Sequence, residues 1–333
     1  MIRLVQIQNG VARQIALVDG AALRLAGGFE STYALGCAAL ERGLDPASIV
    51  RECLTGEALD YDPVYLGRSS WKLLPPIDHP SDPSRCLVTG TGLTHLGSAR
   101  DRQSMHAAAE EEVTDSMKMF RWGVEGGRPG PAAIGTAPEW FYKGTGEILR
   151  AHGEPLPVPA YAEDGGEEAE IAGIYLIDPS GEPRRLGMAA GNEFSDHRFE
   201  KRNYLNLAGS KLRACSLGPE LVIGGDFQSV PGTVTIERNG SSVWSKGICT
   251  GEAEMSHSLQ NLEHHHFKFE GHRRPGDVHI HFFGAAALSF GEGVQLINGD
   301  VMAIRFEGFG RELRNPVAIE RGPARLVEAR PIL

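Results

Sequence analysis

Apolar and polar positions alternate over the first twenty residues, on both sides of an Asn9-Gly10 pair. Two alternating runs joined by Asn-Gly are typical of a β-hairpin. Residues 32–42 instead carry apolar side chains at helical spacing, which predicts a helix. Prolines then cluster from Pro75 to Pro83 and interrupt both patterns. We therefore expect a small N-terminal α/β domain over residues 1–78 and a larger domain over residues 79–333.

The larger domain is predicted to be rich in strands. Residues 101–122 contain strong helix formers without Gly or Pro, so a helix that could act as a lid is expected there. Beyond residue 165, short apolar runs alternate with glycine turns. The clearest predicted strands are Glu168–Ile177, Leu221–Ile223, Thr233–Ile236, Val278–Phe283 and Val301–Phe306. The fold class is therefore α+β, with strands dominating.

Two glutamates, Glu168 and Glu170, stand at the head of one of these predicted strands. Residues two apart in a strand point to the same face, whereas on a helix they would diverge by about 200°. Both carboxylates could therefore meet one cation. Oxygen ligands favour a hard ion such as Mg²⁺ or Mn²⁺, although an alternating charged pair is also what a solvated strand face looks like.

Composition excludes several classes of protein. The chain carries 33 basic and 43 acidic residues, a net charge of −10, and no basic stripe that would attract nucleic acid. Its five cysteines lack CxxC spacing, as expected for reduced thiols in the cytoplasm. Neither a leader-like N-terminus nor an apolar run of membrane-spanning length is apparent. We expect a cytoplasmic protein with no membrane partner.

A series of short motifs occurs in one order along residues 85–317. They are the glycine loop Gly90–Ala99, Glu168-Ala169-Glu170, Asn192-Glu193-Phe194-Ser195, Lys211 ahead of Gly218-Pro219, Pro275–Val278, Asn298–Val301 and Gly308–Asn315. In this order the chain resembles the fumarylacetoacetate hydrolase superfamily. The resemblance implies a mixed β-sandwich roll that binds Mg²⁺ or Mn²⁺ and a 2-oxo acid chelating the ion.

The resemblance also implies roles for particular residues. Glu168, Glu170 and Glu193 fall where the family has its three metal carboxylates, the third of which is commonly Asp. Lys211 falls where the family keeps an active-site lysine, which would stabilise an enolate. Relatives are usually dimers or dimers of dimers, so the resemblance implies a homo-oligomer.

The glycine loop bears on the reaction class. Hydrolytic members of the family carry a histidine that activates water at the position of Ser98. A serine hydroxyl cannot accept water's proton near neutral pH as an imidazole can. Hydrolysis of a carbon–carbon bond is thereby disfavoured, whereas dehydration of a 2-oxo acid needs no activated water.

The strings Gly90–Ala99 and His281–Phe290 resemble those of the sugar-acid branch, which includes 2-keto-3-deoxypentonate dehydratases. The implied enzyme is a hydro-lyase of sugar-acid metabolism and pentose degradation. It would convert a 2-keto-3-deoxypentonate, derived from D-xylonate or L-arabonate, to 2,5-dioxopentanoate. The candidate catalytic residues are Lys211, His95, Asp101 and Glu200, and the candidate substrate-binding residues are Gly92, Thr94, Ser98, His197 and Ala285.

Two other functions stay open. One is a hydrolase of 2,4-dioxo acids, with His95 or His106 in place of the missing histidine. The other is a protein that binds 2-oxo acids without turnover. Two further histidine groups are interpreted as structural: His264-His265-His266 as a polar loop or helix surface, and the pair His279 and His281 as packing or pocket lining, because neither has the spacing of a metal site.

Overall fold

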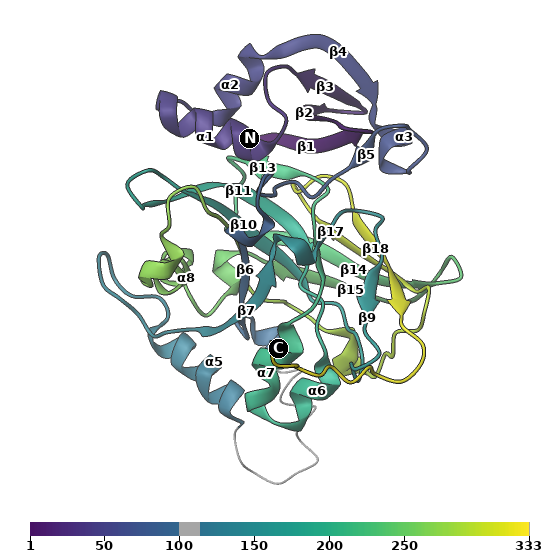
Figure 1. The fold of residues 1–333 in the computed structure, drawn as a ribbon. Helices are drawn as coiled ribbons and strands as arrows, with labels where there is room; N and C mark the ends of the chain where they lie inside the picture. Colours follow the sequence, from purple (N-terminus) through teal and green to yellow (C-terminus); the bar gives the residue numbers. More distant parts are fainter. Residues whose placement is uncertain (100–113, 333) are drawn as a thin grey trace.

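The structure is a computed structural model that describes residues 1–99 and 114–332. Within this part of the chain, strands form two sheets and short helices surround them (Figure 1). The main path of the larger sheet is β4-β3-β2-β1-β13-β11-β10-β16-β6-β7, with β5, β8 and β12 paired beside it. These strands are β1 (Ile2–Asn9), β2 (Ala12–Asp19), β3 (Ala22–Ala26), β4 (Leu54–Asp60), β5 (Lys72–Leu73), β6 (Cys86–Gly92), β7 (Glu139–Thr145), β8 (Leu149–Arg150), β10 (Ala169–Ile177), β11 (Pro183–Asn192), β12 (Cys215–Leu217), β13 (Leu221–Ile223) and β16 (Val278–Phe282).

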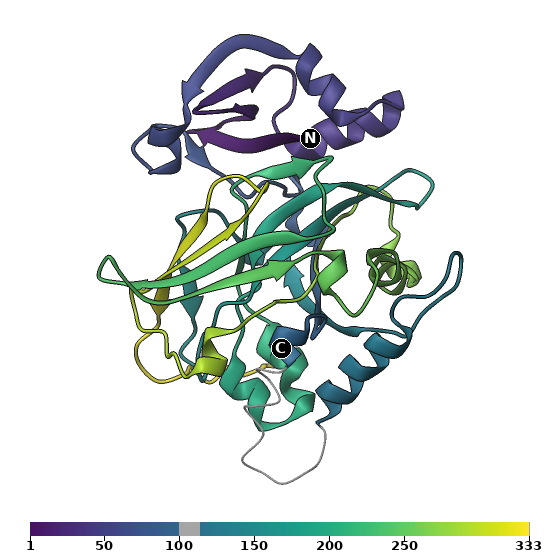
Figure 2. The ribbon, with the colours of Figure 1, turned by 180° about the vertical axis from the view of Figure 1, so that it is seen from behind.

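The smaller sheet follows the order β15-β14-β17-β18-β9. Its strands are β9 (Leu156–Val158), β14 (Val230–Arg238), β15 (Ser241–Thr250), β17 (Val301–Phe306) and β18 (Leu313–Ile319). The β14–β15 hairpin projects from one side of the molecule (Figure 2). All the predicted strands are therefore confirmed, with bounds shifted by a few residues.

The helices are short. They are α1 (Thr32–Arg42), α2 (Pro46–Glu52), α3 (Tyr61–Tyr65), α5 (Asp115–Gly126), α6 (His197–Arg202), α7 (Leu207–Lys211) and α8 (Leu259–Phe267), with 3-10 turns η1 (Pro83–Arg85), η2 (Gly146–Ile148), η3 (Tyr204–Asn206), η4 (Glu252–Glu254), η5 (Glu270–His272) and η6 (Ser289–Glu292). Residues 101–113 of the predicted lid helix lie outside the described residues, and α5 follows them. In the described part of the chain, no helix has the length and apolar character needed to cross a membrane.

The predicted N-terminal hairpin and helix are both confirmed. Strands β1 and β2 pair across Asn9-Gly10, where Gly10 adopts a positive φ of 58° that favours glycine. Helix α1 is capped by the Ser31 side chain, which accepts from the Ala34 amide. It ends at Gly43 in the left-handed conformation.

The N-terminal elements lie as a layer on top of the two-sheet body (Figure 1). Strand β1 nevertheless pairs with β13, so the large sheet runs continuously from one part into the other. The boundary at residue 78 therefore stays a prediction.

Strand β10 lies at the centre of the molecule, and all nine of its residues are buried. Alternate residues serve two cores. Ala172, Ile174 and Leu176 pack in the core that also contains α1, whereas Ile171 and Tyr175 pack with side chains of the smaller sheet. A strand that is buried on both faces has a nearly continuous run of apolar residues in its sequence. The head of this central strand is where the candidate metal ligands lie.

Candidate metal centre

Three carboxylates converge at one end of β10. Glu168 precedes the strand, Glu170 lies within it, and Glu193 follows β11, the strand that pairs with β10. One carboxylate oxygen from each residue lies within 4.8 Å of an oxygen of each of the other two. All three side chains are buried. Cross-strand pairing thus brings together residues that are 23 to 25 positions apart in the sequence.

Two buried lysines flank the carboxylates. Lys211, at the end of α7, places Nζ 2.5 Å from Glu168 Oε1 and 2.6 Å from Glu193 Oε2. Lys143, on β7, places its Nζ 2.5 Å from the other oxygen of Glu193. It also donates to the carbonyls of Phe194 and Lys211, so it ties three parts of the site together.

The turn that carries Glu193 is held by its neighbours. The Asn192 side-chain oxygen accepts from the amides of Glu168 and Phe194, and the Ser195 hydroxyl contacts both Glu193 oxygens at 3.0 Å. Phe194 adopts a φ of 37°, which is uncommon for a residue with a side chain. Such strain persists where the surrounding contacts enforce it, and it is typical of functional sites.

The three buried carboxylates repel one another, and the neighbouring cations attract them. Burial, together with the charges of Glu193 and Glu168, raises the pKa of Glu170 well above its ordinary value. Burial has the same effect on Glu168, but Lys211 and His197 outweigh it and hold its pKa well below the ordinary value. Lys211 and Lys143 pair with Glu168 and Glu193, whereas Glu170 accepts from the Gly284 amide and is repelled by the two neighbouring carboxylates. A divalent cation would relieve this repulsion, so the donor set fits Mg²⁺ or Mn²⁺.

A cavity of about 190 Å³ opens beside the carboxylates. Its lining includes His197 and Glu200, both on α6. His197 Nε2 lies 3.0 Å from Glu168 Oε1, and Glu200 lies 4.0 Å from Lys211 Nζ. Ser116, at the start of α5, also lines the cavity. Two residues of its lining, His197 and Glu200, therefore lie between the cavity and the pair Glu168 and Lys211.

The glycine loop places its side chains differently from what the candidate roles suggest. The Thr94 hydroxyl has one proton and donates it to the Phe283 carbonyl. In its contact with His95 Nδ1 the hydroxyl therefore accepts, and the imidazole donates. The other ring nitrogen then accepts from Thr250. Burial lowers the pKa of His95 to about 4. Both ring nitrogens are thus engaged, and proton transfer by His95 is not favoured in this conformation.

The remaining candidates lie as follows. The Ser98 hydroxyl donates to the His95 carbonyl. Gly92 ends β6 against Glu139, whose carboxylate a side chain at this position would have to displace. Ala285 is buried next to Gly284, whose amide donates to Glu170 at 2.7 Å. Asp101 and His106 lie outside the described residues. The roles given to all these residues stay predictions.

Strand β7 contributes residues that the sequence analysis did not identify. Glu139, Phe141 and Lys143 alternate with more exposed residues and share one face. Lys143 meets Glu193, and the ring of Phe141 lies 4.7 Å from Lys211 Nζ, so this face looks onto the site. Glu139 occupies the same face near Gly92. The alternation of Glu139, Phe141 and Lys143 with more exposed residues could have indicated a strand here, because two charged side chains on one buried face need partners.

The histidine run at 264–266 corrects one interpretation. It lies on α8, but His266 is fully buried and is not part of a helix surface. Its ring stacks on His281 with a 4.5 Å centroid separation and hydrogen-bonds His279 at 2.9 Å. The pair on β16 therefore packs against the run on α8, at a place apart from the carboxylates.

No family model matches the chain, and no curated protein matches it in sequence. Solved structures do match. The apo form of 2-keto-3-deoxy-D-arabinonate dehydratase is 20% identical, covers 96% of this chain and 100% of its own, and has a TM-score of 0.71. A complex of that dehydratase with magnesium and 2,5-dioxopentanoate is 21% identical with the same coverage and a TM-score of 0.70.

A third match is a 2-hydroxyhepta-2,4-diene-1,7-dioate isomerase from Mycobacterium marinum. It is 16% identical, with 96% of this chain and 99% of its own covered, at a TM-score of 0.59. These likenesses show that the chain has this fold. The α+β, two-sheet architecture expected from the resemblance is thereby confirmed.

Proposed function

We propose that the protein is a metal-dependent hydro-lyase that dehydrates a 2-keto-3-deoxypentonate to 2,5-dioxopentanoate. The buried group of Glu168, Glu170 and Glu193 with Lys211 in contact is the observation that carries this proposal. A non-catalytic protein has no need to bury so many charges at the end of one cavity. The fold shared with a dehydratase that binds magnesium and 2,5-dioxopentanoate supports the same substrate class.

The three carboxylates would hold Mg²⁺ or Mn²⁺, which would polarise the 2-oxo group and make the adjacent C3–H more acidic. Lys211, which contacts two of the three carboxylates, would stabilise the negative charge that develops on the oxo oxygen. We assign removal of the C3 proton to Glu200, which lines the cavity near Lys211. The C4 hydroxyl would leave with a proton as water, giving a C3=C4 double bond. Transfer of a proton from C5 to C3 would give the C4=C5 enol, and transfer of its hydroxyl proton to C4 would give the aldehyde.

The engagement of His95 favours dehydration over hydrolysis. An imidazole that activates water needs a free nitrogen and a pKa near neutrality. His95 has both nitrogens on threonines and a pKa lowered to about 4 by burial. It is therefore a poor substitute for the histidine that Ser98 replaces.

The test is an assay of purified protein with Mg²⁺ and each C4 epimer of 2-keto-3-deoxypentonate, read by the appearance of the aldehyde. We expect turnover of one epimer, loss of activity with a metal chelator, and recovery when Mg²⁺ is restored. Lys211→Ala should lower kcat by at least about 100-fold. Absence of turnover on both epimers, or release of pyruvate from an acylpyruvate, would contradict the proposal.

A further inference from the structure

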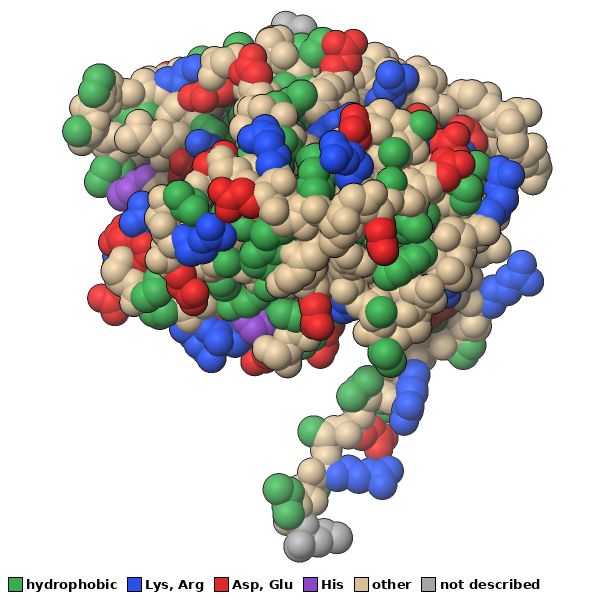
Figure 3. Space-filling model, turned by 90° about the horizontal axis from the view of Figure 1, so that it is seen from above, with side chains coloured by type: hydrophobic (Ala, Val, Ile, Leu, Met, Phe, Trp, Pro, Cys, Tyr) green, Lys and Arg blue, Asp and Glu red, His purple; other side chains and the backbone are tan. Residues whose placement is uncertain are grey.

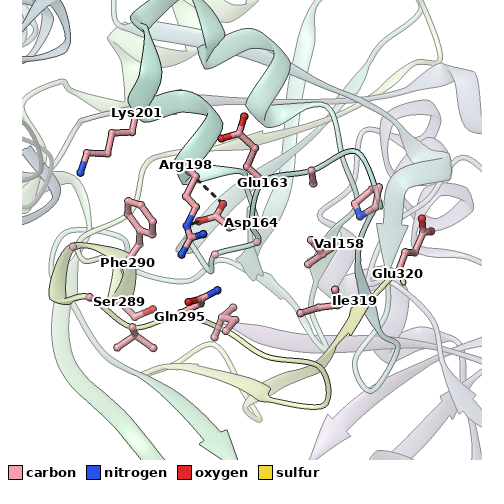
Figure 4. Close-up of a pocket in the computed structure, with 18 of the residues that line it drawn as sticks. Val158, Glu163, Asp164, Arg198, Lys201, Ser289, Phe290, Gln295, Ile319 and Glu320 are labelled. Carbon is pink, nitrogen blue, oxygen red and sulfur yellow. Dashed lines mark hydrogen bonds and ion pairs between the residues drawn. The ribbon is translucent and has the colours of Figure 1, made fainter. Parts of the chain in front are cut away.

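The surroundings of Lys211 differ from those of most cationic side chains in the protein. Figure 3 shows lysines and arginines spread among acidic side chains over one face of the molecule, where they meet water. Lys211 is instead 1% exposed. It is part of the described lining of neither the cavity of about 190 Å³ nor the groove of about 1030 Å³ in Figure 4, where Arg198 pairs with Asp164. Contacts within the protein therefore hold this ammonium group.

An aromatic ring provides one of these contacts. The centroid of the Phe141 ring lies 4.7 Å from Lys211 Nζ, within the distance of about 6 Å over which a cation is attracted to an aromatic face. This attraction is strongest where water is excluded. Phe141 is 3% exposed, so both partners are shielded from solvent. The ring is therefore placed to hold the ammonium group.

The fold makes room for the ring. Phe141 on β7 is the cross-strand partner of Gly90 on β6, and a Cβ at position 90 would lie 2.5 Å from the ring. The glycine thus leaves the space that the ring occupies. Phe141 belongs to none of the five clusters of buried apolar residues in the described part of the chain. Packing in an apolar core therefore does not account for the ring.

Strand β7 holds Lys211 at two points. Lys143, two residues after Phe141 and on the same face of the strand, donates to the Lys211 carbonyl at 3.0 Å. Phe141 meets the other end of the residue, the ammonium group. A lysine side chain is a flexible four-carbon stem, so its charge stays in one place only where contacts at its end fix it. The face of β7 therefore sets both the backbone and the charge of Lys211.

The ring acts independently of the carboxylates. Lys211 Nζ lies 2.5 Å from Glu168 Oε1 and 2.6 Å from Glu193 Oε2, and these carboxylates are also candidate ligands of a divalent cation. A cation bound by them would weaken their attraction for the ammonium group and would repel it. The attraction of the Phe141 ring would persist, because it involves no carboxylate oxygen. Phe141 can therefore hold Lys211 when the carboxylates are engaged.

We propose that Phe141 is a positioning residue for Lys211, and that its ring face keeps the ammonium group beside the carboxylates when they bind a divalent cation. The inference rests on the proposed function, in which Lys211 stabilises the charge on the 2-oxo oxygen. Phe141 needs no contact with the substrate for this role. Its effects on metal binding and on turnover must therefore pass through Lys211, which can be tested.

The first test is a double-mutant cycle on metal binding without substrate. The unchanged chain, Phe141→Leu, Lys211→Met and the double variant are each titrated with MnCl₂ in a calorimeter. We expect Phe141→Leu to weaken Mn²⁺ binding by about threefold or more when Lys211 is present and to change nothing when Met replaces it. Equal weakening in both backgrounds, or none in either, would overturn the proposal. An unchanged chain that does not bind Mn²⁺ would contradict the proposed function and this inference together.

The second test separates the charge of the ring face from its shape. Fluorine atoms draw electron density from an aromatic face and so weaken its attraction for a cation. With 3,4,5-trifluorophenylalanine in place of Phe141, we expect kcat to fall by about threefold or more, while KM and the midpoint of urea unfolding stay nearly the same. The same replacement at Phe309, which is also 3% exposed and packs near Phe306, is the matched control and should leave kcat unchanged. Turnover with an unchanged kcat for fluorinated Phe141 would overturn the inference and leave the proposed function standing.

Discussion

Lys143 is the residue whose contacts most closely control the shape of the candidate site. Its side chain has no exposed surface, and its ammonium group meets Glu193 and two backbone carbonyls. A buried ammonium is tolerated when it is fully paired, and its removal leaves the partners without a donor. Lys143 therefore acts on the geometry of Glu193 and α7 and needs no contact with the substrate.

We expect Lys143→Met, which keeps the length of the side chain, to lower the free energy of unfolding by about 3 kcal/mol. Urea unfolding followed by circular dichroism measures the change. Lys72→Met is the matched control, because Lys72 is exposed on β5 and should change the stability little. A loss below about 1 kcal/mol for Lys143→Met would show that the carbonyls and Glu193 find other partners.

The sequence predicted the residues that depend on local spacing and missed those that depend on distant partners. Glu168 and Glu170 meet because strand geometry puts them on one face, and that follows from the pattern alone. His95 depends on Thr250, which is 155 positions away and offers no local signal. The proton-transfer candidates were therefore the least predictable part of the site.

At the scale of elements, α8 and β16 meet through imidazole rings. His266 on α8 packs on His279 and His281 of β16, which share a face because they are two residues apart. Burial lowers the pKa of both His279 and His281 to about 3, and it lowers that of His266 well below the ordinary value. The sequence predicted the shared face of the β16 pair. The inward orientation of His266 depends on how α8 docks, and the helix's weak apolar pattern did not indicate it.

This packing predicts sensitivity to acid. Below an unfolded pKa of about 6.5 the unfolded chain binds protons that the buried rings do not, so stability falls as the pH falls. Each buried ring should cost about 2 kcal/mol of stability at pH 5 relative to pH 8. His281→Asn retains a partner for Thr89 and removes one such group, so the difference between pH 8 and pH 5 should shrink by that amount.

Unfolding in urea at the two pH values measures it. His264→Asn, a half-buried position on the same helix, is the matched substitution. If the two variants change the difference in unfolding free energy between pH 8 and pH 5 equally, the β16 histidines do not account for the acid sensitivity.

At the scale of the whole molecule, the N-terminal layer is joined to the two-sheet body through a buried carboxylate. Glu220, just before β13, is fully buried. It accepts from Tyr61 of α3 and from the Arg311 amide, each at 3.0 Å, and pairs with Arg3 of β1 at 3.1 Å. The Arg311 guanidinium in turn lies 3.9 Å from the ring centroid of Tyr61. One side chain therefore links two N-terminal elements to the loop before β18.

Removal of this link should loosen the N-terminal layer before the rest. Glu220→Ala leaves the Tyr61 hydroxyl and the Arg311 amide without their acceptor and Arg3 without its charge partner, which should lower the free energy of unfolding by about 3 kcal/mol. Hydrogen exchange read by mass spectrometry should show faster exchange in β1–β4 while β10 and β11 keep their protection. Glu57→Ala on the exposed strand β4 is the control. Uniformly faster exchange across both parts would instead mean that the layer and the body open as one cooperative unit, and that the continuous pairing of β1 with β13 outweighs the carboxylate in joining them.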